Sequence, residues 1–418
     1  MNELPENGEI IHDWNRVGFA GPLTKHNVTL LDETLRDGIQ SPSAVDPPIE
    51  DKQALLRLMD RLGIEYADIG LPGAGRRAVE DVEALAKLIR DENLSIKPSC
   101  AARTHPNDIK PIIEISQRTG VELEVLTFLG SSPIRQYSES WDLGRMERLV
   151  AEAVKLSVDA GLPTGFVTED TIRSAPESLE RLFKTAIDNG ASRLVLCDTV
   201  GHATPDGIKA LVSWCRQLIE TMGVEVGLDW HGHNDRGLAL VNSLFAIQYG
   251  CDRVHGTALG IGERVGNCPM DVLLVNLKLL GTIDNDLSAL MSYCRAASLA
   301  TRTDIPRNYP VIGDDAFRTA TGVHAAAIVK AKRKGNDWLA DRIYSGVPAS
   351  MVGKQQVIEV GHMSGESNVV AWLQAHGYQP VPSLVAEIYR AAKGANRTLH
   401  DDEIEGIVLR FASAPADA

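Results

Sequence analysis

Eight short apolar segments that alternate with longer helical patterns constrain the fold of this chain more strongly than any other feature of its sequence. The helical patterns, such as residues 52–63 and 146–161, place apolar side chains at i, i+3 and i+4. Strands that alternate with helices are joined by right-handed crossovers and form parallel sheets. Eight such units over roughly 260 residues match the length of a (β/α)8 TIM barrel. The predicted strands are residues 28–31, 66–70, 95–101, 122–128, 164–168, 193–197, 224–229 and 252–257.

A doubly wound open sheet is the alternative fold, but no GxGxxG motif follows the first predicted strand. We therefore predict an α/β fold in which a TIM barrel is followed by a mainly helical C-terminal subdomain. The predicted parts are an N-terminal arm (1–23), a barrel (24–285) and a helical subdomain (286–418). Three amphipathic helices are expected between residues 362 and 413.

The charge and the cysteine pattern narrow the functional class. A formal net charge of -14 argues against a nucleic-acid-binding protein. The six cysteines lie far apart without a CxxC pair, which favours reduced thiols over disulfides or a zinc knuckle. The N-terminal stretch lacks the apolar core of a signal peptide, and no apolar run approaches the roughly 18 residues of a membrane span. We expect a cytoplasmic protein.

The stretch LDWHGHND (228–235) contains two histidines in the pattern of a metal site. His231 and His233 lie at i and i+2, so both imidazoles point the same way from an extended segment. Ordinary polar residues at a strand end are the alternative, and a carboxylate at a matching strand end decides between the two. Active sites of TIM barrels lie at the carboxyl ends of the strands. Asp37, in DETLRDGIQ after the first strand, is the candidate carboxylate ligand, and Arg36 beside it can donate to a developing oxyanion.

Other strand ends carry side chains that suit a carboxylate or carbonyl substrate. The glycine-rich stretch 256–271, which holds Asn267, follows the eighth strand and opens a helix, an arrangement suited to close backbone approach to a ligand. The remaining candidates are Arg103 after the third strand, Ser131, Ser132 and Arg135 after the fourth, Glu169 after the fifth and Thr199 after the sixth.

Four of these motifs resemble one enzyme family in the same order along the chain. They are DETLRDGIQ (32–40), DTVG (198–201), HGHNDRGLALVN (231–242) and GIGERVGN (260–267). The resemblance is to the acyl-CoA Claisen-condensing branch of the DRE-TIM metallolyases, which includes 2-isopropylmalate, homocitrate and citramalate synthases. It implies a condensation of acetyl-CoA with a 2-oxo acid that depends on a divalent metal (Mn²⁺, Zn²⁺ or Mg²⁺), followed by hydrolysis of the thioester.

The resemblance also implies roles for single residues. Asp37, His231 and His233 would bind the metal and leave positions open for the oxo acid, and Asn267 would support this site. In the same comparison Arg36 resembles the arginine that stabilises enolate charge, Gln40 lies in the substrate shell, Thr199 matches the threonine that holds the oxo-acid carboxylate, and Glu169 is an acidic residue without an assigned role.

The C-terminal part continues the resemblance. Residues 309–330 (YPVIGDDAFRTATGVHAAAIVK) are similar to the family segment that reaches over the barrel mouth, which implies that His324 is the base or part of its relay. Residues 343–353 (IYSGVPASMVG) imply that Tyr344 is a polar partner of His324. In the condensing enzymes this subdomain covers the barrel of the neighbouring protomer, so the resemblance implies a homodimer with exchanged lids.

The sequence does not determine which 2-oxo acid is the acceptor, and it leaves two other functions open. A hydroxyacyl-CoA lyase of the same superfamily is the first alternative, with Cys268-Pro269 as an echo of its catalytic cysteine loop, and a non-catalytic metabolite-binding barrel is the second. Ile39 and the small residues 69–77 favour a roomy, apolar acceptor pocket, whereas Arg103 and Arg135 favour a second carboxylate. We predict a 2-alkylmalate or arylalkylmalate synthase with 2-isopropylmalate as the default product, while benzylmalate and homocitrate stay open.

Overall fold

The computed structural model describes residues 10–16 and 28–413 of the chain. These residues fall into two units, one over residues 28–305 and the other over residues 10–16 with 306–413, and each is described here by itself. Residues 10–16 are the part of the predicted N-terminal arm (1–23) that the structure describes, and the rest of the arm lies outside the described residues. Within the described parts of the chain, no helix combines the length and the apolar character that crossing a bilayer requires.

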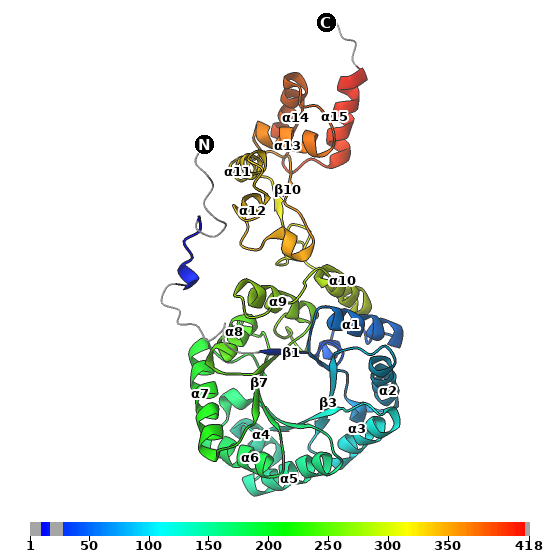
Figure 1. The fold of residues 1–418 in the computed structure, drawn as a ribbon, viewed down its shortest axis with the longest axis vertical. Coiled ribbons are helices and arrows are strands. Elements are labelled where there is room, and N and C mark those ends of the chain that lie inside the picture. Colours follow the sequence, from blue (N-terminus) through cyan, green and yellow to red (C-terminus); the bar gives the residue numbers. More distant parts are fainter. Residues whose placement is uncertain (1–9, 17–27, 414–418) are drawn as a thin grey trace. The chain divides into compact units, whose positions relative to one another are not determined.

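The first unit is a closed barrel of eight parallel strands in sequence order, surrounded by helices, which confirms the predicted fold (Figure 1). The barrel closes where β1 pairs with β8, with Leu31 opposite His255. The strands are β1 (Thr29–Asp32), β2 (Tyr66–Asp68), β3 (Lys97–Arg103), β4 (Glu124–Gly130), β5 (Thr164–Glu169), β6 (Arg193–Asp198), β7 (Gly227–Gly232) and β8 (Arg253–Gly256).

The helices of this unit follow the predicted rhythm. The helix predicted over residues 146–161 is α5 (Leu143–Asp159), which begins after Asp142, whose side chain accepts a hydrogen bond from the backbone N–H of Arg145. The others are α1 (Ile49–Arg61), α2 (Arg76–Asp91), α3 (Pro106–Thr119), α4 (Pro133–Glu139), α6 (Pro176–Asp188), α7 (Pro205–Met222), α8 (Ala239–Tyr249), α9 (Met270–Leu279) and α10 (Leu290–Thr301). Helix α10 packs against α1, and this unit extends to residue 305.

The inside of the barrel is filled in layers. Leu31, Leu126, Val195 and Cys197 form an apolar cluster of buried side chains. Toward the amino ends of the strands, Arg253 is fully buried between the carboxylates of Asp229 (2.7 Å) and Glu124 (2.7 Å), and Arg193 joins the same cluster. A charged layer therefore closes the bottom of the barrel and leaves the opposite end free for the site.

The second unit is mainly helical. A short parallel pair, β9 (Arg318–Thr319) and β10 (Val357–Ile358), accompanies α11 (Gly322–Arg333) and α12 (Asp337–Ala340). The three helices predicted between residues 362 and 413 are present as α13 (Glu366–Ala375), α14 (Pro382–Gly394) and α15 (Asp401–Ser413). They share an apolar core of their own that includes Trp372, Leu373 and Ile388.

Candidate metal centre at the barrel mouth

Two chain segments bring the predicted metal ligands together. Strand β7 extends to Gly232, so His231 lies within the strand, opposite Cys197 of β6. The backbone N–H of His233 donates to the carbonyl of Asp198, which continues this pairing by one residue and keeps both imidazoles on one side. Asp37 lies in the turn after β1, where the N–H groups of Arg36 and Gly38 both donate to the carbonyl of Glu33.

The side chains of Asp37, His231 and His233 form a small triangle of ligand atoms. The two Nε2 atoms lie 3.2 Å apart, and Oδ2 of Asp37 lies 3.6 Å from each of them. Donors that share one ion at roughly 2.0–2.2 Å, with angles of about 90° to 110°, are separated by roughly 2.8–3.6 Å. All three residues are buried, and their ligand atoms point to one place. The triangle therefore has the size of a metal site that keeps further positions open.

The electrostatics of the triangle also suit a cation. Burial, reinforced by His231, lowers the pKa of His233 to about 4, so its ring is neutral and has a lone pair to give. Burial alone would raise the pKa of Asp37, but the charges of Arg36 and His231 outweigh it and lower the pKa. Nδ1 of His233 has no hydrogen-bond partner although it is buried. Imidazole nitrogens together with a carboxylate are a typical donor set for a divalent transition metal or zinc.

Asn267 supports this triangle from the loop after β8. Its amide group donates to Oδ2 of Asp37, and an isolated bridge pairs the backbones of His233 and Asn267. A Cβ atom at Gly262 would lie 2.8 Å from Oδ1 of Asn267, so the loop can pass this close only with glycine there. In this arrangement Asn267 orients the carboxylate ligand, and its own Oδ1 stays buried without a hydrogen-bond partner.

Arg36 is held beside the triangle by three carboxylates. Its guanidinium lies 2.6 Å from Glu33, 2.8 Å from Asp68 and 3.3 Å from Asp37. Burial works against the charge of Arg36, but these carboxylates outweigh it and raise its pKa well above the usual value. Burial raises the pKa of Asp68 to about 6, although Arg36 opposes the change. Arg36 is thus a fixed cation at the edge of the proposed metal site.

A cavity of about 300 Å³ opens at this end of the barrel. The predicted substrate residues Gln40 and Thr199 line it together with the triangle and Arg36, and so does Glu169, the acidic candidate without an assigned role. Burial raises the pKa of Glu169, against the opposing charge of Arg135. The apolar side of the cavity is formed by Leu71, Ala101, Leu126, Phe128, Val167, Val195 and Cys197.

Two predicted substrate residues do not line this cavity. Both carboxylate oxygens of Asp108, in the first turn of α3, accept hydrogen bonds from Arg103 at 2.7 and 2.8 Å, and the Arg103 side chain is 66% exposed. Ser132 caps α4, where its hydroxyl accepts from the backbone N–H of Arg135. Both side chains are held by local hydrogen-bond partners, which the strand pattern does not reveal.

His324 and Tyr344 lie together in the second unit. Their rings stack with centroids 3.9 Å apart and an angle of 23° between the planes, and both side chains are exposed. The structure brings this predicted pair together, while its role as a base over the barrel mouth stays a prediction.

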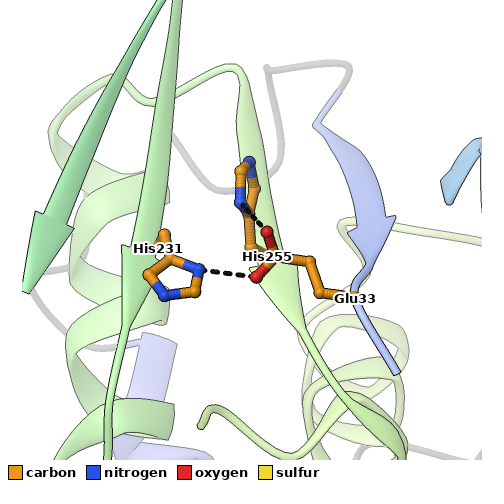
Figure 2. Close-up of side chains that lie close together, drawn as sticks. All are labelled: Glu33, His231 and His255. Carbon is orange, nitrogen blue, oxygen red and sulfur yellow. Dashed lines mark ion pairs between the residues drawn. The ribbon is translucent and has the colours of Figure 1, made fainter. Parts of the chain in front are cut away.

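Sequence reasoning missed three ionisable residues of the site. Glu33 lies between the rings of His231 and His255, as Figure 2 shows, and Asp68 pairs with Arg36. All three lie at or next to the carboxyl end of a barrel strand. Glu33 directly follows β1, Asp68 is the last residue of β2, and His255 is next to last in β8. The same rule that selected Asp37 would have found them if it had been applied to every strand end.

Comparisons with known proteins agree with this geometry. The sequence model of the HMGL-like family matches residues 27–299. The chain is 30% identical to homocitrate synthase AksA of Methanopyrus kandleri over 397 residues, which cover 93% of this chain and 94% of the relative. It is 30% identical to the enzyme of the same name from Methanothermobacter thermautotrophicus, with 96% and 99% covered. It is 27% identical to 2-isopropylmalate synthase of Nitratidesulfovibrio vulgaris, with 91% and 73% covered.

Solved structures share the barrel. An HMG-CoA lyase from Bacillus subtilis superposes with a TM-score of 0.55 at 21% identity, covering 67% of this chain and 96% of that one. A hydroxymethylglutaryl-CoA lyase from Pseudomonas aeruginosa gives 0.54 at 17% identity, with 65% and 92% covered. At these identities the likeness shows a common fold. With the family match over most of the chain and its relatives at 30% identity, the chain belongs to the HMGL-like family, the DRE-TIM metallolyases that its motifs resemble.

Proposed function

We propose that this protein catalyses a metal-dependent Claisen condensation of acetyl-CoA with a 2-oxo acid, followed by thioester hydrolysis, to give a 2-alkylmalate-type product and free CoA. The observation that carries the proposal is the open triangle of Asp37, His231 and His233 beside the fixed cation Arg36 in one cavity. Its relatives at 27–30% identity that are named homocitrate and 2-isopropylmalate synthases support the same reaction class.

The chemistry follows from the charges around the cavity. A divalent ion bound by the triangle would polarise the keto group of the oxo acid. A base removes a proton from the acetyl methyl group, the resulting enolate carbon bonds to the keto carbon, and the carbonyl electron pair moves to oxygen. We assign the base to His324, because a neutral imidazole can accept a proton from a carbon acid held within its reach. Water then cleaves the thioester and releases the CoA thiol.

Chain residues bind and orient the acid in this scheme. Arg36 stabilises negative charge on the enolate or alkoxide oxygen, because a fixed cation needs no reorganisation when that charge develops. The hydroxyl of Thr199 accepts a hydrogen bond from the backbone N–H of Asp170 at 2.8 Å. Its proton therefore points elsewhere and can be donated to the carboxylate of the oxo acid. Gln40 lies at the exposed rim and is assigned to the same shell.

The cavity favours an acceptor with an apolar side chain. Both cations that line it are already engaged, Arg36 by three carboxylates and Arg264 by Asp235 at 2.8 and 2.9 Å. Arg103 is bound to Asp108 outside the cavity. The distal carboxylate of a dicarboxylic oxo acid would meet the apolar wall without a free cation from the barrel residues that line the cavity, at a cost of about 3 kcal/mol or more. We therefore propose a branched or aromatic monocarboxylic acceptor, with 2-isopropylmalate as the default product.

The buried position of Cys268 argues against the lyase alternative. Cys268, the residue that echoes the catalytic cysteine loop, is fully buried, and burial raises the pKa of its thiol to about 12. A thiol in this environment is a core side chain and does not react as a thiolate near neutral pH.

The test is release of free CoA from acetyl-CoA with a panel of oxo acids in the presence of Mn²⁺, Zn²⁺ or Mg²⁺. We expect release with 2-oxoisovalerate or phenylpyruvate, and kcat/KM lower by about 100-fold or more with 2-oxoglutarate, since 1.36 kcal/mol corresponds to a factor of ten. Preference for 2-oxoglutarate would refute the proposed acceptor. No release with any acid and any of these metals would refute the condensation itself.

A further inference from the structure

We propose that Glu33 is a positioning residue, which holds the imidazole of His231 with Nδ1 protonated and directs Nε2 toward the metal. The inference rests on the metal site proposed above and assigns a task to a carboxylate that the reaction scheme leaves unused. Glu33 is buried at the turn after β1, between two histidines from other strands (Figure 2).

The two ring nitrogens of His231 face different partners. Nδ1 lies 2.6 Å from Oε2 of Glu33, whereas Nε2 lies on the other side of the ring, 3.2 Å from His233 and 3.6 Å from Asp37. Oε2 of Glu33 has no hydrogen-bond partner of good geometry, His231 included, so the 2.6 Å contact with Nδ1 is a close charge contact that no other donor shares. A carboxylate opposite Nδ1 stabilises the proton there and leaves the lone pair on Nε2.

Glu33 itself is fixed from two further directions. Its other oxygen, Oε1, lies 2.6 Å from Arg36 and 3.3 Å from Nδ1 of His255. The carboxylate cannot turn away from His231 without losing its contact with Arg36.

His255 connects this carboxylate to the charged layer below it. Its Nε2 lies 3.1 Å from Asp229, which Arg253 and Arg193 contact at 2.7 and 2.5 Å. Burial alone would lower the pKa of His255, but Glu33 and Asp229 face its two ring nitrogens and raise the pKa. Glu33, which contacts His231, is thus linked through His255 to the charged layer at the bottom of the barrel.

A second metal site made of Glu33, His231 and His255 is the competing interpretation, since their ligand atoms also cluster. Two donors on one ion at roughly 2.0–2.2 Å are separated by at least about 2.8 Å. The separation of 2.6 Å between Glu33 and His231 is too short for a shared ion and matches a charge-assisted N–H···O contact. The cluster therefore supports a ligand of the first site and does not hold a second ion.

The test compares the Mn²⁺ affinity of the whole protein with that of three variants, measured from the EPR signal of free Mn²⁺. Removing such an outer partner weakens metal binding roughly 10- to 100-fold. We expect this loss in Glu33→Gln and also in Glu33→Asp, which keeps the charge but is too short to reach Nδ1. Asp32→Asn is the matched control, because the Asp32 carboxylate is equally buried one residue earlier but contacts Thr34 and Tyr293 instead.

A second readout reports the tautomer directly. In the Zn²⁺-loaded wild type, the ¹⁵N signals of His231 should show a proton on Nδ1, and the resonance of that proton should shift in both Glu33 variants. Wild-type affinity in Glu33→Gln, or a loss in Asp32→Asn as large as in Glu33→Gln, would overturn the inference. Full affinity in Glu33→Asp would also overturn it, because charge alone would then suffice. Should Glu33→Gln fail to fold, Glu33→Asp decides.

Failure of the metal site itself gives a different result. If the wild type binds no divalent ion, or if His231→Ala leaves its affinity unchanged, the proposed metal site is refuted. If the wild type binds through His231 and the Glu33 variants bind equally well, only the role of Glu33 is refuted.

Discussion

Replacing Arg253 with methionine should destabilise the barrel far more than the same replacement of an exposed arginine. The Arg253 side chain is fully buried and contacts Asp229 at 2.7 Å and Glu124 at 2.7 and 3.1 Å. Its guanidinium also lies 4.5 Å from the ring centroid of Tyr66. Methionine fills similar space without charge, so the variant leaves the buried carboxylates of Asp229 and Glu124 with Arg193 as their remaining arginine partner, besides the contact of Asp229 with His255.

The magnitude follows from this arrangement. Removing one partner from a buried ion pair costs about 3–5 kcal/mol, because a charge remains without compensation. Domains of 150–250 residues lose about 2–4 °C of melting temperature per kcal/mol, so Arg253→Met should lower it by roughly 6–20 °C. The measurement is thermal unfolding followed by circular dichroism, with urea unfolding as a check on the free energy.

Arg57→Met is the control. Arg57 contacts Glu92 at 2.6 Å, a distance as short as those of Arg253, but both side chains are about 40% exposed (42% and 39%). Such a surface pair contributes about 0–1 kcal/mol. Adding Glu124→Gln to Arg253→Met should restore part of the stability, since it removes one uncompensated charge. Equal melting temperatures for the Arg253 and Arg57 variants would refute the reasoning from burial.

Three further outcomes are expected. Asp37→Asn should lose the metal affinity and the metal-dependent release of CoA, and a variant that keeps both would remove Asp37 from the metal site. His324→Asn should lower kcat by roughly 10²- to 10⁴-fold if His324 is the base, while the Mn²⁺ affinity stays unchanged. Burial raises the pKa of Asp32 from 3.8 to about 6, against hydrogen bonds from Thr34 and Tyr293. The folded state therefore binds the proton more tightly, and stability falls by up to roughly 3 kcal/mol as pH rises through this window. Asp32→Asn should lack this part of the pH dependence in urea unfolding, and parallel curves would contradict it.

Much of the site could be predicted from local sequence patterns, because a parallel barrel fixes where the ends of its strands lie. The period of the apolar residues identifies strands and helices, and a parallel barrel brings all carboxyl strand ends to one face. Asp37 and His231 could therefore be assigned to one place although they are far apart in the chain, and the structure brings their ligand atoms to within 3.6 Å.

The tertiary structure decided which ionisable side chains face one another. Arg103 ends a barrel strand, yet Asp108 binds it outside the cavity. Glu33 lies within the motif DETLRDGIQ, but only the structure shows that its carboxylate lies between His231 and His255. Strand alternation reports only the side of the sheet on which a residue lies. Whether a buried charge meets a metal ligand, a substrate or a compensating ion depends on distances of about 3 Å between segments remote in sequence, because buried charges are stable only when such partners are present.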